Sequence, residues 1–342
     1  MLCVHKRALC PHFVQALEER AFGVSQFAYR KKHGARDAIA FYVLSWIESL
    51  NRGSKTGVYC SDVSGAFDRV SAERLMEKLS CFNLNPQMLG VIRSWLRERQ
   101  GFVIVSGQQS SQMRLRNMVY QGTVFGPSLW NAYFGDCVCA LYGCGFEVVI
   151  YADDCNAFKQ YPRTTCNNRI LDDLRECQRA LHRWGSANAV IFDAGKEEFM
   201  IVSTTEPFGG PVKLLGVQFD AKLLMYDAVH KCAVKASWKL KSLLRVRRFY
   251  NVDDLIMLYK SHILSFLEYR IPGVHFASTH VLSELDAMQR NLRRRRVHEI
   301  QFSSVVHSQR YCDSRFDTQS CSATRSATFV AILLFGWSTG IA

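Results

Sequence analysis

Two adjacent aspartates lie inside an apolar, strand-forming run, and no other feature of the sequence constrains the fold as strongly. The run covers residues 146–158, Phe-Glu-Val-Val-Ile-Tyr-Ala-Asp-Asp-Cys-Asn-Ala-Phe, with β-branched and aromatic residues on both sides of Asp153 and Asp154. This pattern predicts a β-hairpin with Ala152, Asp153 and Asp154 at its tip. Neighbouring carboxylates repel one another, so a divalent cation that neutralises them is one explanation of the pair. The alternative is ordinary turn chemistry, in which Asp is common.

The composition indicates a globular protein with a polyanionic partner. The 342 residues are 48% hydrophobic and 21% charged, enough for one large core or a few subdomains. A formal net charge of +13 favours nucleic acid or a membrane surface as the partner, and the basic excess is strongest between Lys231 and Arg296.

Neither the cysteines nor the apolar segments indicate export or a membrane span. The 13 cysteines include no Cys-x-x-Cys pair, and the amino terminus lacks the apolar core of a signal peptide. We therefore expect reduced thiols and an intracellular location. Residues 327–337 are apolar but too few to span a bilayer, so no membrane partner is predicted.

Apolar periodicity and turn residues predict an α+β core followed by a helical region. Strands are predicted at 58–61, 199–202 and 212–219, and hairpins at 146–158 and from the pair of strands 102–105 and 112–116. Helices are predicted at 39–50, after Ser71, from Pro86 to Leu96, after Pro127, at 165–187 and repeatedly between 222 and 296. Residues 297–342 show no periodicity and are predicted to be an irregular, disordered tail.

A second acidic motif, Ser-Asp-Val-Ser-Gly-Ala-Phe-Asp at 61–68, follows the predicted strand at 58–61. Two-metal phosphoryl transfer needs carboxylates from two strands that bridge Mg²⁺ ions roughly 3.5–4 Å apart. Asp62 and Asp153 form the natural pair, with the Val63 carbonyl as a further ligand and Asp154 as a weaker one. The alternative for Asp62 is a residue that simply ends a strand, and Asp68 is expected to be structural.

The third motif is a glycine-flanked loop that leads into a helix. Residues 120–131 read Tyr-Gln-Gly-Thr-Val-Phe-Gly-Pro-Ser-Leu-Trp-Asn. Glycine lets the backbone approach a nucleotide or a template base closely. The alternative is an ordinary helix start with Pro127 in the first turn.

With these three motifs in this order, the chain resembles the reverse transcriptase domain of non-LTR (LINE-type) retrotransposons. The resemblance rests on residues 62–68, 121–131 and 151–154, and it extends over about residues 10–293. Further similar segments are 26–37 in the fingers, Gly195-Lys196-Glu197 in the palm, Lys213-Leu-Leu-Gly216-Val in the primer grip, and 266–270 with 285–289 after the palm.

The resemblance implies a right-hand polymerase fold with an antiparallel palm sheet and a helical thumb. The expected divisions are partial fingers at 1–57, a palm at 58–220 with an inserted fingers segment at about 71–120, and a thumb-like region at 221–296.

The family also implies a role for individual residues. Asp62, Asp153 and Asp154 are the catalytic acids that hold two Mg²⁺ ions, which Mn²⁺ can replace. Phe67 blocks the ribose 2′-hydroxyl, and Lys196 protonates the pyrophosphate, the alternative being an exposed loop lysine. The remaining residues expected to bind substrate are Arg30, Gln121, Gly122 and Val63.

Five further residues are expected to contact nucleic acid. Lys213 and Gly216 belong to the segment that resembles the primer grip. Lys231, Lys235 and Lys239 are spaced four apart, so they share one helical face that can follow a phosphate backbone. The alternative for these lysines is a solvated surface.

The predicted function is RNA-directed DNA polymerase in retrotransposition, acting in the nucleus on an RNA template, a DNA primer and dNTPs; no stable protein partner can be inferred. The alternatives are a polymerase-derived module that only binds nucleic acid, an RNA-directed RNA polymerase, which Phe67 opposes, and a metal-carboxylate hydrolase. No segment before Gln26 matches the family's Arg-Pro-Ile region, and the resemblance stops at Arg293. These gaps predict a fragment of a truncated element.

Overall fold

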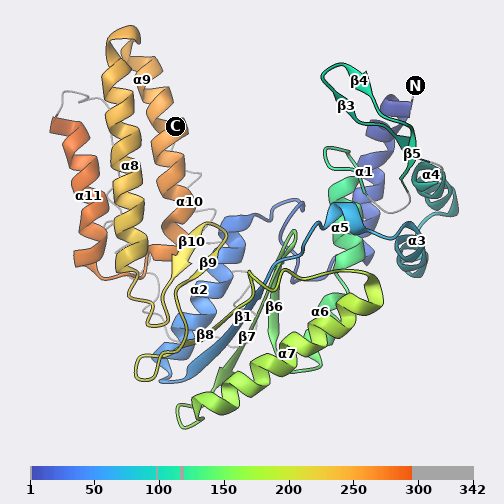
Figure 1. Ribbon diagram of the computed structural model, residues 1–342. Coiled ribbons are helices and arrows are strands. Elements are labelled where there is room, and N and C mark those ends of the chain that lie inside the picture. Colours follow the sequence, from blue (N-terminus) through green and yellow to red (C-terminus); the bar gives the residue numbers. More distant parts are fainter. Residues whose placement is uncertain (1, 98, 116–118, 295–342) are drawn as a thin grey trace. The chain divides into compact units, whose positions relative to one another are not determined.

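The computed structural model describes residues 2–97, 99–115 and 119–294, which form two compact units (Figure 1). The first unit contains residues 1–38 and 55–201, and the second contains 39–54 and the chain from Val202 onward. The boundary passes through helix α2 (Ala35–Asn51), most of which belongs to the second unit.

A four-stranded sheet forms the centre of the first unit. Its strands are β1 (Lys55–Ser61), β6 (Glu147–Tyr151), β7 (Asp154–Tyr161) and β8 (Glu198–Val202), in the order β6-β7-β1-β8. Strand β7 is antiparallel to both of its neighbours, and every residue of β1 is buried.

Helix α7 (Asn167–Asn188) lies across one face of this sheet (Figure 1). Its apolar residues recur at helical spacing, and Ile170, Leu174 and Leu181 are fully buried. Gly57 of β1 permits this contact, because a Cβ there would lie 2.7 Å from Cγ2 of Ile170. The short helix α6 (Cys137–Tyr142) packs beside α7 and β6.

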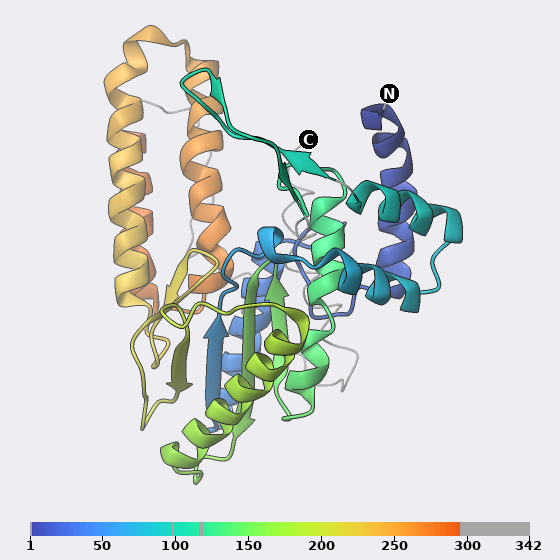
Figure 2. The same cartoon turned by 45° about the vertical axis from the view of Figure 1, so that its right-hand side comes forward.

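The rest of the first unit consists of helices and a two-ladder hairpin. Phe13 of α1 packs edge-on against Phe125, with the ring centroids 5.5 Å apart, which joins α1 to the start of α5. Figure 2 shows the hairpin, in teal, extending as a ribbon from the helices. The elements are α1 (Leu2–Arg20), η1 (Phe67–Arg69), α3 (Ala72–Cys81), α4 (Pro86–Leu96), β2 (Gln100–Gly101), β3 (Ile104–Val105), β4 (Gln108–Gln109), β5 (Met113–Arg114) and α5 (Gly126–Phe134).

The second unit is mainly helical and holds its own two-stranded sheet. Trp46 of α2 packs on Phe219, with ring centroids 5.5 Å apart, and Gly273 fits against the same sheet because a Cβ there would lie 2.9 Å from Val217 Cγ1. The elements after α2 are β9 (Val212–Leu214), β10 (Val217–Phe219), α8 (Tyr226–Val246), η2 (Arg247–Phe249), α9 (Val252–Tyr259), the π-helical turn η3 (Lys260–Leu264), α10 (Ser265–Val274) and α11 (Thr279–Arg294).

Most elements agree with the prediction, and the α+β class is confirmed. The expected caps are present: Ser71 Oγ accepts from Arg74 N at 3.4 Å, and Asn85 Oδ1 accepts from Gln87 N at 2.8 Å. In the described part of the chain, no helix is long and apolar enough to cross a bilayer.

Several elements differ from the prediction, and the short helix α6 was not expected. Helix α1 was not expected, because it contains Pro11 and its apolar residues do not gather on one face. Residues 212–219 form a hairpin rather than one strand, since Leu215 and Gly216 take positive φ values of 47° and 79°. The predicted hairpin of strands 102–105 and 112–116 is present with a different register: β3 pairs with β4 near its tip, and β2 pairs with β5 at its base. The predicted tail at 297–342 lies outside the described residues.

Candidate active site

The two adjacent aspartates lie at the tight turn between β6 and β7. Tyr151 pairs with Asp154, so Ala152 and Asp153 form the tip and Asp154 begins β7, one residue earlier than predicted. Ala152 has a φ of 59°, a left-handed backbone conformation that is unfavourable for any residue with a Cβ. Its carbonyl oxygen accepts a hydrogen bond of 2.8 Å from the buried Trp130 Nε1, which stabilises the turn.

Asp62 follows the last residue of β1 and comes next to this turn. Ser61 pairs with Cys155, so the antiparallel register places Asp62 beside Asp154. Burial raises the pKa of Asp154 to about 6, and the charges of Asp153 and Asp62 add to this effect. Burial also raises the pKa of Asp153, with Asp62 contributing. The three carboxylates thus form one acidic cluster whose members repel one another.

Lys196 supplies the positive charge that the cluster does have. Its Nζ donates a hydrogen bond to Asp62 Oδ2 and lies 3.7 Å from Asp193 Oδ2. The hydrogen bond with Asp62 raises the pKa of Lys196, so the exposed amine is protonated at neutral pH.

Val63 pairs with Phe192 in an antiparallel bridge beside the carboxylates. The bridge is made by Ser64 N to Ile191 O at 2.8 Å and Asp193 N to Asp62 O at 2.9 Å. In this type of pair, the N–H and C=O of the central residue point away from the partner segment. The Val63 carbonyl is therefore directed away from residues 191–193.

The donor set has the chemistry that magnesium prefers, namely carboxylate and carbonyl oxygens. Even so, across the ranges that the structure describes, no group of three His, Cys, Asp or Glu side chains converges as a preformed metal site. Mg²⁺ is commonly held by only one or two carboxylates together with substrate phosphates, so this arrangement still fits a site that the nucleotide completes.

Phe67 contacts the same turn through Trp130. The Phe67 ring centroid lies 5.8 Å from that of Trp130 at an interplanar angle of 31°, and Phe67 O accepts from Val119 N at 2.8 Å. The chain of contacts from Phe67 through Trp130 to Ala152 was not predicted. The sequence placed Trp130 in the motif at 120–131 and in the helix after Pro127, but no local signal connects it with residue 152.

Gln121 and Gly122 form an exposed turn before α5. Thr123 Oγ1 donates to Tyr120 O at 2.7 Å, and Gly122 has a φ of 75°, which favours glycine. The loop thus presents a side chain and a stretch of bare backbone to solvent.

Arg30 takes part in a local network. Its Nε donates to Glu18 Oε1 at 2.7 Å, and its guanidinium also donates to Gly23 O at 2.6 Å and Gln26 O at 2.9 Å. These bonds stabilise the loop between α1 and α2, and the substrate-binding role of Arg30 stays a prediction.

In the second unit, two of the predicted basic residues meet at Gln218. Lys213 of β9 lies opposite Gln218, whose Oε1 accepts from Lys231 Nζ at 2.7 Å. Nearby in the same unit, Tyr269 Oη donates to Leu215 O at 2.8 Å and holds the turn that contains Gly216.

The other two predicted lysines converge on one aromatic ring. Lys235 Nζ and Lys239 Nζ of α8 lie 5.8 Å and 5.4 Å from the ring centroid of Phe266 on α10. Arg270 Cζ lies 3.9 Å from the same centroid. Three cations around one ring create a positive patch, to which the sequence had assigned Lys235 and Lys239 but not Arg270.

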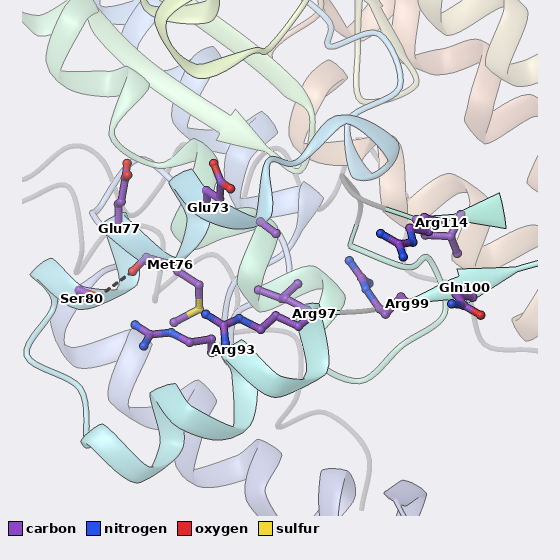
Figure 3. A pocket seen from close by; sticks show the side chains of 12 residues that line it. Glu73, Met76, Glu77, Ser80, Arg93, Arg97, Arg99, Gln100 and Arg114 are labelled. Carbon is purple, nitrogen blue, oxygen red and sulfur yellow. Dashed lines mark hydrogen bonds between the residues drawn. The ribbon is translucent and has the colours of Figure 1, made fainter.

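A further basic feature, absent from the sequence prediction, is a pocket of about 1240 Å³ in the first unit (Figure 3). Four arginines contribute to its lining, from the end of α4 and from the hairpin, while Glu73 and Glu77 line it from α3. Arg99 Cζ also lies 4.7 Å from the ring centroid of Tyr120, the residue before the Gln121 turn. The local signal was the cluster of arginines at positions 93, 97 and 99, which join Arg114 in this pocket.

The family model described as "Reverse transcriptase (RNA-dependent DNA polymerase)" matches residues 3–219. This match covers more than half of the chain. The chain belongs to the reverse transcriptase family. The match includes the segment before Gln26, in which no family motif was recognised.

Named relatives of this reverse transcriptase domain come from a mobile element and a transposon. It is 26% identical over 302 residues to the RNA-directed DNA polymerase from mobile element jockey of Drosophila funebris, which covers 81% of this chain and 32% of that protein. It is 25% identical over 210 residues to the probable RNA-directed DNA polymerase from transposon BS of Drosophila melanogaster, covering 59% of this chain and 23% of the relative. The chain thus spans about a third or less of the length of these relatives.

The right-hand polymerase fold is also that of a solved telomerase. The structure of telomerase from Candida albicans in complex with the TWJ fragment of telomeric RNA matches with a TM-score of 0.50 and 14% identity. The match covers 90% of this chain and 58% of the telomerase chain. Reverse transcriptases generally use divalent metal ions.

Proposed function

We propose that this domain is an RNA-directed DNA polymerase of a non-LTR retrotransposon, which extends a primer 3′-hydroxyl with dNTPs on an RNA template. The observation that carries the proposal is the position of Asp62, at the end of β1, beside the Asp153-Asp154 turn of β7. Family membership and the retrotransposon relatives support the same activity. The genomic target of such an element implies that the protein acts in the nucleus.

The proposed metal ligands are the carboxylates of Asp62, Asp153 and Asp154 and the carbonyl of Val63. When bound, two Mg²⁺ ions, or Mn²⁺ in their place, would stabilise the attacking and leaving oxygens of phosphoryl transfer. Burial raises the pKa of Asp153 and Asp154, and the charge of Asp62 contributes to both shifts. This supports the assignment, because a bound divalent cation would favour the ionised form of both carboxyls.

The neighbouring side chains have separate roles in the proposal. Lys196 holds a proton at Nζ that it can give to the pyrophosphate as it leaves. Phe67, held by its contact with Trp130, fills the space that a ribose 2′-hydroxyl would need. The exposed turn at Gln121 and Gly122 contacts the template base and the nucleotide.

Nucleic acid would contact both units through phosphate groups. In the second unit, the proposed contacts are Lys213, Gly216, Lys231, Lys235 and Lys239, with residues 221–296 acting as the thumb. In the first unit, the pocket of four arginines supports binding of a single-stranded template backbone, since guanidinium groups bind phosphate bidentately. We take residues 58–220 as the palm, with fingers at 1–57 and about 71–120.

The experiment is primer extension by the purified protein on primed RNA, with Mg²⁺ and either dNTPs or NTPs. We expect extension with dNTPs, which Asp153→Asn abolishes while template binding stays nearly unchanged. Asp172→Asn is the matched control, because Asp172 is an exposed carboxylate on α7 that pairs with Arg175. Equal extension by wild type and Asp153→Asn would exclude the metal assignment, and a preference for NTPs would indicate an RNA polymerase.

One observation favours a second function, that of a module that binds nucleic acid without polymerising. Lys196 is bonded to Asp62, so its ammonium group occupies a carboxylate that the proposed metal ions would need. A wild-type protein that binds primed RNA in a salt-dependent manner but extends no primer would support this alternative.

A further inference from the structure

Glu197 is the buried centre of a hydrogen-bond cluster that has no role in the proposed mechanism. Its side chain is only 6% exposed. Oε1 lies 2.6 Å from Tyr59 Oη and 2.6 Å from His182 Nε2, while Oε2 accepts from Gln178 Nε2 at 2.6 Å. A buried carboxylate is retained only when its oxygens are hydrogen-bonded in this way, so the contacts fix its position.

The cluster joins three elements of the first unit. Tyr59 lies on β1, three residues before Asp62, whereas Gln178 and His182 lie one turn apart on the same face of α7. Glu197 precedes β8 and follows Lys196 directly. On the carboxyl side of Lys196, the chain is therefore held to β1, the strand that precedes Asp62, by the hydrogen bond between Glu197 and Tyr59.

The amino side of Lys196 is fastened as well. Lys196 N donates to Asp193 O at 2.9 Å, and Gly195 N donates to Asp193 Oδ1 at 3.1 Å. Asp193 N in turn donates to Asp62 O at 2.9 Å. Lys196 thus lies between Asp193, which is bonded to Asp62, and Glu197, which is bonded to Tyr59 of β1.

We propose that Glu197 is a positioning residue that aims Lys196 at Asp62. Lys196 closes the turn that begins at Asp193, and Glu197 leads from this turn into β8. The buried side chain of Glu197 therefore fixes the backbone from which the exposed Lys196 side chain reaches Asp62 Oδ2. A lysine side chain has many rotamers, and a fixed backbone on both sides narrows the set that the ammonium samples. The catalytic role of Lys196 in this inference rests on the proposed function, whereas the contacts that position Lys196 do not depend on it.

The first test is a double-mutant cycle in primer extension. Glu197→Ala should lower kcat about 10-fold, within the range for residues that orient a reacting group, with the KM for dNTPs nearly unchanged. In a Lys196→Ala background the same change should cost nothing further, and Glu197→Gln should restore most of the loss. Glu198→Ala is the matched control, because this exposed carboxylate is the next residue. An equal loss in both backgrounds would overturn the proposal.

The second test needs no polymerase activity and uses Mn²⁺ as the probe, titrated without nucleotide and followed by electron paramagnetic resonance. Because the ammonium at Asp62 opposes a cation, Glu197→Ala should tighten Mn²⁺ binding about 3-fold, as Lys196→Ala should to a greater extent. Tyr59→Phe, which removes one bond of the cluster and keeps the ring, should give a smaller shift. An unchanged Mn²⁺ affinity in folded Glu197→Ala would overturn the proposal, whereas a wild type that extends no primer would count only against the proposed function.

Discussion

Trp130 Nε1 donates a hydrogen bond to the carbonyl oxygen of Ala152 over 2.8 Å, so α5 holds the turn that carries Asp153. The same indole also packs against Phe67 and stacks on Phe134, with the Phe134 ring centroid 5.0 Å away. Trp130 therefore connects Phe67, which is proposed to discriminate against ribonucleotides, with the turn that carries the proposed metal ligand Asp153.

Trp130→Phe should both destabilise the protein and slow primer extension. The change keeps an aromatic ring but leaves the Ala152 carbonyl without its donor, at a cost of about 1–3 kcal/mol in the free energy of unfolding. Chemical denaturation followed by circular dichroism measures the first effect, and single-turnover extension measures the second. Trp238→Phe is the control for stability, since Trp238 is 70% exposed on α8. Wild-type values of both quantities in Trp130→Phe would show that the bond is dispensable.

Phe67→Ala should relax the choice between deoxynucleotides and ribonucleotides. Removing the ring opens the space assigned to the 2′-hydroxyl, so the ratio of kcat/KM for rNTP to that for dNTP should rise about 10- to 200-fold. Steady-state incorporation of single nucleotides on one RNA template gives both constants. The exposed Phe208 provides the control Phe208→Ala, which should leave the ratio unchanged. A ratio that does not move in Phe67→Ala would remove Phe67 from the nucleotide site.

The strands and turns that carry the aspartates could be predicted because their signals are local. The apolar run around Asp153, the strand before Asp62 and the caps Ser71 and Asn85 each depend on a few neighbouring residues. The contacts that hold the site together could not be predicted in this way. Tyr59 and Glu197 are 138 positions apart, and nothing in either segment indicates the other.

The hairpin at 212–219 shows a second limit of local signals. Leu215 takes a φ of 47°, which its side chain disfavours, so the sequence reads as a continuous strand. The turn is held instead by a tertiary contact, the hydrogen bond from Tyr269 Oη to Leu215 O.

Magnesium should stabilise the protein more at neutral than at acidic pH. The pKa of Asp154 in the folded protein is raised from 3.8 to about 6, mainly by burial. Between these two values the folded state binds more protons than the unfolded state, so the stability of the metal-free protein falls as pH rises. Above about pH 6 the carboxyl of Asp154 is ionised, so the unfavourable burial of its charge and its repulsion by Asp153 and Asp62 are both present. A bound Mg²⁺ can then offset both.

Thermal unfolding with and without Mg²⁺ checks this expectation. The Mg²⁺-induced rise in Tm should be about 2–4 °C larger near pH 7.5 than near pH 5. In Asp154→Asn the difference between the two pH values should shrink, because the titrating group is absent. An equal rise at both pH values in the wild type would contradict the assignment of Asp154 to the metal site.

Replacing the cations around Phe266 should weaken nucleic-acid binding in a way that depends on salt. Lys235 and Lys239 lie within 6 Å of that ring together with Arg270, and such a patch releases counterions when phosphates bind. The double variant Lys235→Ala with Lys239→Ala should reduce the slope of log K against log salt by about 1–2. Fluorescence anisotropy with a primed RNA, measured over a series of salt concentrations, gives the slope. Lys241→Ala provides the matched control, because Lys241 is exposed two residues further along α8 and so points away from the face of Lys239. If the slope is the same in the double variant and in the control, the patch around Phe266 is a solvated surface and not a phosphate contact.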